Sequence, residues 1–233
     1  MLGILVQLAV SWLLVWFFEK SNLNVLGFFP TKRRLFDFSL FFIITSFFCA
    51  SGFFMKMYFA DQQWKLNPDF SFSTILSGTW WNIKSVLFEE LIFRGVLFYI
   101  LIKKLGSIKA IIISSVVFGM YHWFSQGSWG NIQQMVFTFL ITGAMGLLLA
   151  YGYAKSYSLY IPIAIHLGWN LTQSVVFSEG NIGNQLLVQV KPVLQVELSY
   201  LIFFCILLLP MVSMLLINYY LIRKRNKKFP FIV

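Results

Sequence analysis

The stretch Phe88-Glu89-Glu90-Leu91-Ile92-Phe93-Arg94 places three ionisable side chains inside a long apolar segment. Charged residues are costly in the hydrocarbon core of a membrane, so their presence there indicates a functional site. Two further apolar segments carry the two histidines of the chain, His122 and His166. Polar groups inside three separate apolar segments suggest one shared site, to which each of the three segments contributes.

The composition is that of a membrane protein. Of the 233 residues, 59% are hydrophobic and 11% are charged, which lies far outside the range of soluble globular domains. Irregular backbone cannot face lipid, and the apolar runs are too long and too little alternating for the strands of a barrel. The sequence therefore predicts an all-α fold, a polytopic transmembrane helix bundle that forms a single domain over residues 1–233.

About seven spans are expected, because each crossing of the bilayer takes roughly 20 apolar residues. The expected spans cover residues 1–18, 35–59, 79–102, 107–124, 131–153, 157–177 and 198–222. The segments 61–77 and 178–197 are expected to be external loops. Within the fifth span, the small residues of Thr142-Gly143-Ala144-Met145-Gly146 are expected to let helix backbones approach closely.

The net charge of +10 does not indicate a nucleic-acid partner, because the basic residues lie at the ends of apolar runs. Thirteen of the 18 Lys and Arg residues occupy alternate loops, the asymmetry that keeps such loops in the cytoplasm. This pattern predicts an external N-terminus, a basic cytoplasmic tail over residues 223–233, and contacts with anionic lipid headgroups. The first apolar run lacks a basic start and a cleavage site, so we expect it to be retained as a span.

Helical spacing divides the polar residues into pairs. Residues four apart share one face of a helix, whereas neighbours in sequence point about 100° apart. Glu90 and Arg94 can therefore form an ion pair, and Glu89 is left to face a cavity. His166 and Asn170 are also four apart, so they present two neutral hydrogen-bond donors on one face.

This set of groups suits amide hydrolysis. Glu89 can take a proton from a water that His122 holds, and His166 with Asn170 can stabilise the developing oxyanion. A divalent metal such as zinc, bound by Glu89, His122 and His166, is an alternative arrangement, since three protein ligands plus water is a usual catalytic site. The sequence has no His-Glu-x-x-His motif, no Gly-x-Ser-x-Gly motif and no pair of mid-span aspartates for other protease chemistries.

The order Glu-Glu-x-x-x-Arg, Phe-x-x-x-His, His-x-x-x-Asn resembles the CAAX-protease and bacteriocin-processing family of intramembrane peptidases, also called the Abi family. The resemblance covers residues 80–172. The residues that it assigns to the catalytic site are Glu89, Glu90, Arg94, His122, His166 and Asn170. In that order they would be the water-activating glutamate, its supporting ion pair, the second group at the water and two oxyanion donors. The resemblance also implies a helical bundle and a peptide or protein substrate. The family is often labelled metallopeptidase, although the mechanism inferred for its prenyl-protein branch needs no zinc bound directly.

Three functions remain open at this level. The first is a glutamate-dependent intramembrane endopeptidase that acts on a membrane-associated peptide or protein. The second is a non-catalytic immunity or partner-binding protein, of the kind proposed within the same family for bacteriocin self-immunity. The third is a proton-coupled transporter, which would use the same buried carboxylates and histidines. Residue usage rich in Phe, Ile, Lys and Asn suggests a bacterial plasma membrane, and the endoplasmic reticulum membrane is the alternative for a eukaryotic source. The sequence carries no signal of oligomeric state.

Overall fold

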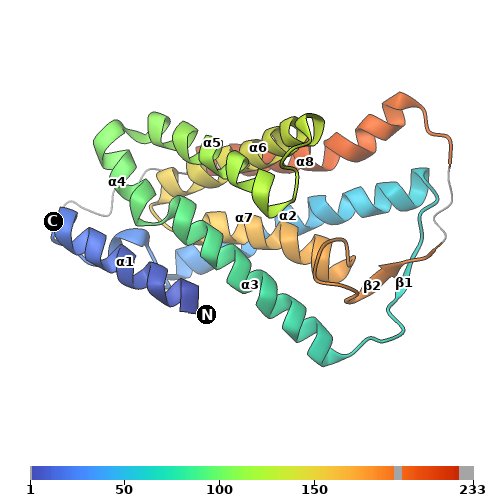
Figure 1. The fold of residues 1–233 in the computed structure, drawn as a ribbon, viewed down its shortest axis with the longest axis horizontal. Helices are drawn as coiled ribbons and strands as arrows, with labels where there is room; N and C mark the ends of the chain where they lie inside the picture. The colour runs from blue at the N-terminus through green and yellow to red at the C-terminus, as the bar shows by residue number, and fades with distance from the viewer. Residues whose placement is uncertain (1, 192–195, 226–233) are drawn as a thin grey trace. The chain divides into compact units, whose positions relative to one another are not determined.

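The computed structural model describes residues 2–191 and 196–225. Within these residues the chain forms eight α-helices and one sheet of two short strands (Figure 1). The expected all-α fold is therefore confirmed. Residues 226–233 of the expected basic tail, with Lys227 and Lys228, lie outside the described residues, as does Met1.

The helices are, in chain order, α1 Leu2–Glu19, α2 Lys32–Phe59, α3 Phe72–Arg94, α4 Val96–Leu105, α5 Ser107–Ser125, α6 Ile132–Ser156, α7 Tyr160–Leu171 and α8 Tyr200–Arg223. A 3-10 turn, η1 (Leu23–Leu26), follows α1, and a π-helical turn, η2 (Thr172–Val176), continues α7. The strands β1 (Trp64–Leu66) and β2 (Leu187–Gln189) pair in antiparallel register. Each of the two expected external loops thus contributes one strand.

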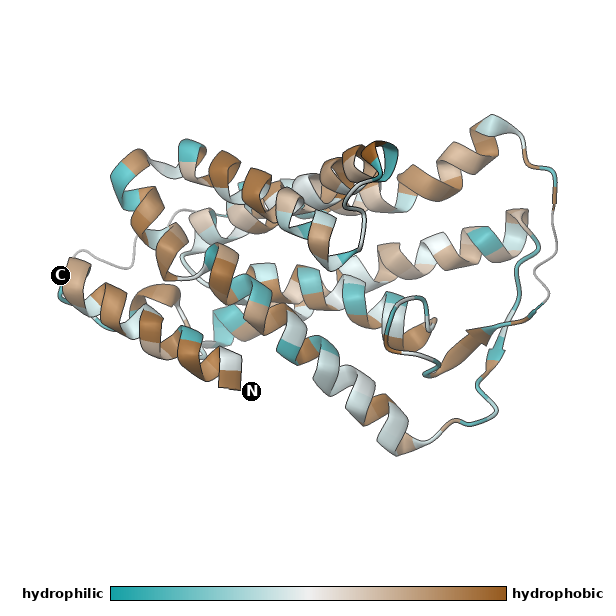
Figure 2. Cartoon of the chain, viewed as in Figure 1, coloured by the Kyte–Doolittle hydropathy of each residue, from teal (hydrophilic) through white to brown (hydrophobic). Residues whose placement is uncertain are grey.

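Among the described residues, five helices are long and apolar enough to cross a membrane, namely α1, α2, α5, α6 and α8. These helices support a multi-pass membrane protein, and its orientation stays a prediction. The expected set of about seven spans also included α3 and α7. The helix α7 has only 12 residues, and α3 carries the charged side chains of the central motif. In Figure 2, α1 is mostly brown, whereas α3 has white and teal segments.

One expected span has different bounds, because the segment 79–102 is not a single helix. The helix α3 already begins at Phe72, where the hydroxyl of Ser71 accepts a hydrogen bond of 3.1 Å from the backbone N–H of Thr74. It ends at Arg94, because Gly95 has a non-helical ψ of −147°. A Cβ at Gly95 would lie 2.0 Å from the Leu91 carbonyl oxygen. A side chain at this position would therefore prevent the sharp turn into α4.

The chain divides into two compact units. The first comprises residues 1–38, 87–163 and 219–233, and the second comprises residues 39–86 and 164–218. In the first unit, α5 packs along α6, and buried apolar side chains from α1, η1, α4, α5 and α6 form a core. Members of that core are Val15, Leu26, Phe98, Ala110 and Tyr153. The expectation of a single domain stays a prediction.

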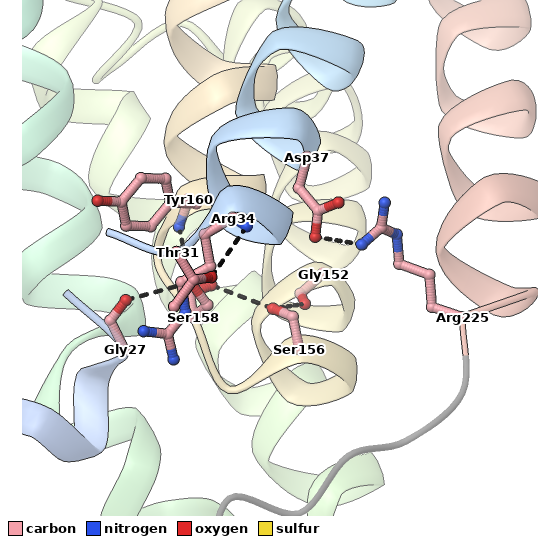
Figure 3. Close-up of polar contacts among 9 residues, drawn as sticks. All are labelled: Gly27, Thr31, Arg34, Asp37, Gly152, Ser156, Ser158, Tyr160 and Arg225. Atoms are coloured by element: carbon pink, nitrogen blue, oxygen red, sulfur yellow. Dashed lines mark hydrogen bonds and ion pairs between the residues drawn. The ribbon is translucent and has the colours of Figure 1, made fainter. Parts of the chain in front are cut away.

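Polar contacts connect the loop after η1 to the turn between α6 and α7, all within the first unit (Figure 3). The Ser158 hydroxyl donates to the Gly27 carbonyl oxygen at 3.3 Å. Gly27 has a φ of 69°, and a Cβ there would lie 2.4 Å from the Tyr157 carbonyl oxygen. Nearby, Arg225 forms an ion pair with the buried Asp37 at the start of α2.

The core of the second unit is aromatic. Phe53 stacks on Phe177 with ring centroids 3.9 Å apart, and Trp64 packs edge-on against Phe53 at 5.6 Å. Buried Cys49 completes this cluster. These contacts join α2 to β1 and to the segment that follows η2.

Candidate active site

The ion pair expected from helical spacing is present on α3. Arg94 Nη1 lies 3.1 Å from Glu90 Oε1, and both side chains are fully buried, with 0% exposure. A buried charge is stable only when a partner and hydrogen bonds replace the lost water. The pair is therefore a structural part of the first unit, in which Arg94 balances the charge of Glu90.

The second terminal nitrogen of Arg94 binds α6. Arg94 Nη2 donates to the Gly146 carbonyl oxygen at 3.2 Å, and the guanidinium carbon lies 4.1 Å from the centroid of the Phe118 ring. A Cβ at Gly146 would lie 3.1 Å from Phe118 and 3.4 Å from Arg94 Nη2. The absence of a side chain at Gly146 therefore makes room for the guanidinium, beyond the packing role expected for the small residues of α6.

Glu89 points toward His122 on α5. Glu89 Oε2 and His122 Nε2 are 3.8 Å apart, and the two side chains are 12% and 11% exposed. The other ring nitrogen, His122 Nδ1, is 2.8 Å from the Phe118 carbonyl oxygen. A carbonyl oxygen only accepts hydrogen bonds, so Nδ1 carries the hydrogen, and in the neutral ring Nε2 presents its lone pair toward Glu89.

Aromatic rings and a backbone contact hold this part of α5 against α3. Phe93 meets the Phe118 ring edge-on at 5.0 Å, and Tyr121 lies 5.3 Å from both the Phe93 and the His122 rings. The Ser114 hydroxyl donates to the Phe93 carbonyl oxygen at 2.8 Å. These contacts fix the relative position of the two helices that carry the carboxylate and the imidazole.

His166 and Asn170 belong to the second unit, where α7 packs closely on α2. His166 is buried, with 6% exposure, and Asn170 is half-buried. A Cβ at Gly168 would lie 2.8 Å from the Phe42 carbonyl oxygen, and the Ser46 hydroxyl donates to the Gly168 carbonyl at 3.2 Å. The glycine between the two polar residues thus allows the close approach that positions them.

Two polar residues near Asn170 were not identified from the sequence. The Ser174 hydroxyl lies 2.6 Å from the Asn170 carbonyl oxygen and 3.2 Å from Asn82 Oδ1. Asn82 is buried on α3, and its amide nitrogen donates to the Gly78 carbonyl at 2.9 Å. Ser174 lies in the π-helical turn η2, a type of turn that is frequent at functional sites. The signal that could have identified Asn82 is a carboxamide in an apolar helix, seven residues before Glu89.

The alternative with a metal stays a prediction, because Glu89 and His122 belong to the first unit and His166 to the second. Within residues 2–191 and 196–225, no three His, Cys, Asp or Glu side chains are grouped so that they could hold a metal ion. Of the three expected ligands, Glu89 and His122 are neighbours. No catalytic step is therefore assigned to a metal.

The first unit thus holds a carboxylate beside an imidazole, and the chain has five candidate membrane spans among its described residues, a combination found in multi-pass membrane proteins with a polar site. Residues 71–172 match the model of a family described as type II CAAX prenyl endopeptidase, Rce1-like. All six candidate site residues lie inside the matched segment. The resemblance seen in the three sequence motifs is therefore confirmed for this part of the chain.

A curated relative has a similar sequence. The Bacillus subtilis (strain 168) protein named "Putative membrane peptidase YdiL" is 33% identical over 89 residues. The aligned part is 38% of this chain and 32% of that protein, so the similarity spans about a third of the relative's length. No solved structure matches the chain.

Proposed function

We propose that this chain is an intramembrane endopeptidase in which Glu89 activates a water molecule for attack on a peptide bond. The observation that supports it is the arrangement of Glu89 and His122, whose facing atoms are 3.8 Å apart. Both atoms accept hydrogen bonds, because the hydrogen of His122 is held on Nδ1 by the Phe118 carbonyl. A bridging water can donate one hydrogen to each group, and such bridges are common across separations of this size.

The reaction then needs one proton transfer in each direction. Glu89 removes a proton from the water while the water oxygen forms a bond to the carbonyl carbon of the substrate. In the proposed mechanism, His166 and Asn170 donate hydrogen bonds to the resulting oxyanion. Glu89 returns the proton to the leaving nitrogen as the C–N bond breaks. Glu90 takes no part in these transfers, because its charge is paired with Arg94.

The substrate would be a membrane-associated peptide or protein, and the chain would act in a plasma membrane. Two findings support this proposal, the family match over residues 71–172 and the five apolar helices among the described residues. The water-activating group is carried on α3, so the bond to be cut has to reach residues that are themselves largely shielded from solvent.

The test compares cells that carry the intact chain with cells that carry Glu89→Gln at the same abundance. Mass spectrometry of membrane and secreted peptides should show at least one peptide end that depends on Glu89. Glu19→Gln is the matched control, because it makes the same change at a carboxylate of α1 that is paired with Lys103. A phenotype that persists in Glu89→Gln, with no change in any peptide end, would favour the non-catalytic immunity or partner-binding alternative.

A further inference from the structure

A cavity lies wholly within the second unit, and none of the proposed catalytic residues lines it. Its volume is about 320 Å³, which falls within the usual range of roughly 300–1,000 Å³ for ligand sites. The lining comes from α2, α7 with η2, α8 and the segments that follow α2 and η2 and precede α8, and most of it is apolar. The lining residues on which the argument depends are Cys49, Phe53, Lys56, Glu179, Ile206 and Pro210.

One wall of the cavity is formed by α2. On that helix the lining residues are Cys49, Gly52, Phe53 and Lys56, at spacings that place them on one face. The seven steps from Cys49 to Lys56 correspond to about 10 Å at 1.5 Å per residue. Half of the hydrocarbon core of a bilayer is about 15 Å thick. The face therefore extends over about two thirds of the length of one lipid chain that lies parallel to the helix.

The far side of the cavity is a similar face of α8. It contains Phe203, Ile206, Leu207 and Pro210, again at helical spacing. At Gly52 the two helices α2 and α8 come close together, because a Cβ there would lie 3.3 Å from the Pro210 ring. The space is thus bounded between two apolar helix faces, a shape that suits a flexible alkyl chain.

The end of the cavity near the last turn of α2 is charged. Lys56 Nζ lies 2.8 Å from Glu179 Oε1, and the two side chains are 29% and 48% exposed. The Lys56 ammonium also lies 4.7 Å from the centroid of the Phe53 ring. A ligand in the cavity would meet one positive and one negative group side by side, next to an aromatic wall.

We propose that this cavity binds one acyl chain of a phosphatidylethanolamine molecule, with the headgroup placed at Lys56 and Glu179. The phosphate complements the Lys56 ammonium, and the primary ammonium of the lipid can donate hydrogen bonds to the Glu179 carboxylate. An anionic lipid such as phosphatidylglycerol would bring only a negative charge, which Glu179 repels. The alkyl chain passes from one apolar surrounding to another, so the contacts of the headgroup, rather than hydrophobic burial, supply the preference for this lipid. This binding does not depend on the proposed peptidase activity.

The experiment uses the full chain in phosphatidylcholine vesicles, because the quaternary ammonium of that lipid has no N–H to donate to Glu179. The probe is phosphatidylethanolamine with a photoactivatable diazirine on its acyl chain, and phosphatidylglycerol with the same chain is compared with it. Mass spectrometry then locates the labelled residues. We expect labelling of the lining residues of α2 and α8, stronger with phosphatidylethanolamine than with phosphatidylglycerol.

Two variants of α8 form a matched pair. Ile206→Trp fills the cavity and should reduce labelling of the lining about tenfold, which corresponds to about 1.4 kcal/mol. Leu209→Trp adds the same ring at a side chain that is 52% exposed and outside the lining, so it should leave labelling unchanged. Equal labelling in the two variants, or labelling spread evenly over the exposed face of α8, would show only surrounding bilayer lipid and overturn the proposal.

The headgroup assignment has its own variant, which tests the proposal even if Ile206→Trp fails to fold. Glu179→Gln changes a side chain that is 48% exposed and removes the acceptor for the lipid ammonium, so it should lower phosphatidylethanolamine labelling to the level of phosphatidylglycerol. Equal labelling by the two lipids in the unchanged chain would overturn this assignment. Glu89→Gln should label like the parent chain, so a failure here is distinguishable from a failure of the proposed peptidase function.

Discussion

Removal of Arg94 should strongly destabilise the first unit. In Arg94→Met the Glu90 carboxylate keeps 0% exposure but loses the ion pair, and the Gly146 carbonyl loses a donor. Loss of one partner of a buried ion pair typically costs about 3–5 kcal/mol. At about 2–4 °C for each kcal/mol in a chain of this size, the thermal midpoint should fall by about 6–20 °C.

The double variant Glu90→Gln with Arg94→Met separates charge from packing. It removes both charges and keeps similar side-chain volumes, so it should recover much of the lost stability, because exchange of a buried pair for uncharged groups is often close to neutral. Lys103→Gln is the control for a pair with Glu19 in which the lysine side chain is 49% exposed, and it should cost less than the loss of the fully buried pair, at about 1 kcal/mol.

The assay is the thermal unfolding of the purified chain in detergent, followed by circular dichroism, for the three variants and the parent. A thermal midpoint of Arg94→Met within a degree or two of the parent would refute the argument from burial. A thermal midpoint of the double variant as low as that of Arg94→Met would refute it as well. Cleavage that returns in the double variant would show that the pair supports the fold and takes no direct part in the reaction.

Other substitutions test single contacts. Gly146→Ala puts a methyl group 3.1 Å from Phe118 and should cost about 1–3 kcal/mol, whereas Gly143→Ala, whose nearest neighbour is at 3.9 Å, should leave the thermal midpoint unchanged. His122→Gln should lower cleavage at least about 100-fold without loss of folded protein, and an unchanged rate of peptide-end formation would contradict its proposed role. Gly27→Val combines a φ of 69° with a contact at 2.4 Å and should reduce the yield of folded protein in membranes; parental yield would argue against the observed turn.

The polar residues of the candidate site were accessible from the sequence because an apolar background makes them conspicuous. The spacing of Glu90 and Arg94 predicted a contact that the structure contains. The family resemblance predicted that His122 lies beside Glu89. The hydrogen bond between His122 Nδ1 and the Phe118 carbonyl oxygen depends on the orientation of the ring, which residue spacing does not determine.

The missed features depend on contacts between residues that are distant in sequence or on local sterics. The end of α3 at Arg94 was missed because the apolar run continues past Gly95, and a glycine alone does not end a membrane helix. The pairing of Trp64 with Gln189 joins two segments that look like separate loops. Asn82 was missed because its relation to Ser174 spans 92 positions of the chain, and no periodic pattern records such a contact.

The hydrogen bond from His122 to the Phe118 carbonyl lies within a single helix, and this sets how the imidazole can exchange protons. One of its two nitrogens is occupied by a bond one turn back along α5, so protons can enter or leave the ring only through Nε2. A ring with one accessible nitrogen cannot relay a proton from one side to the other. Any proton exchanged between this ring and Glu89 must therefore pass through Nε2, on the side of the ring that faces the carboxylate.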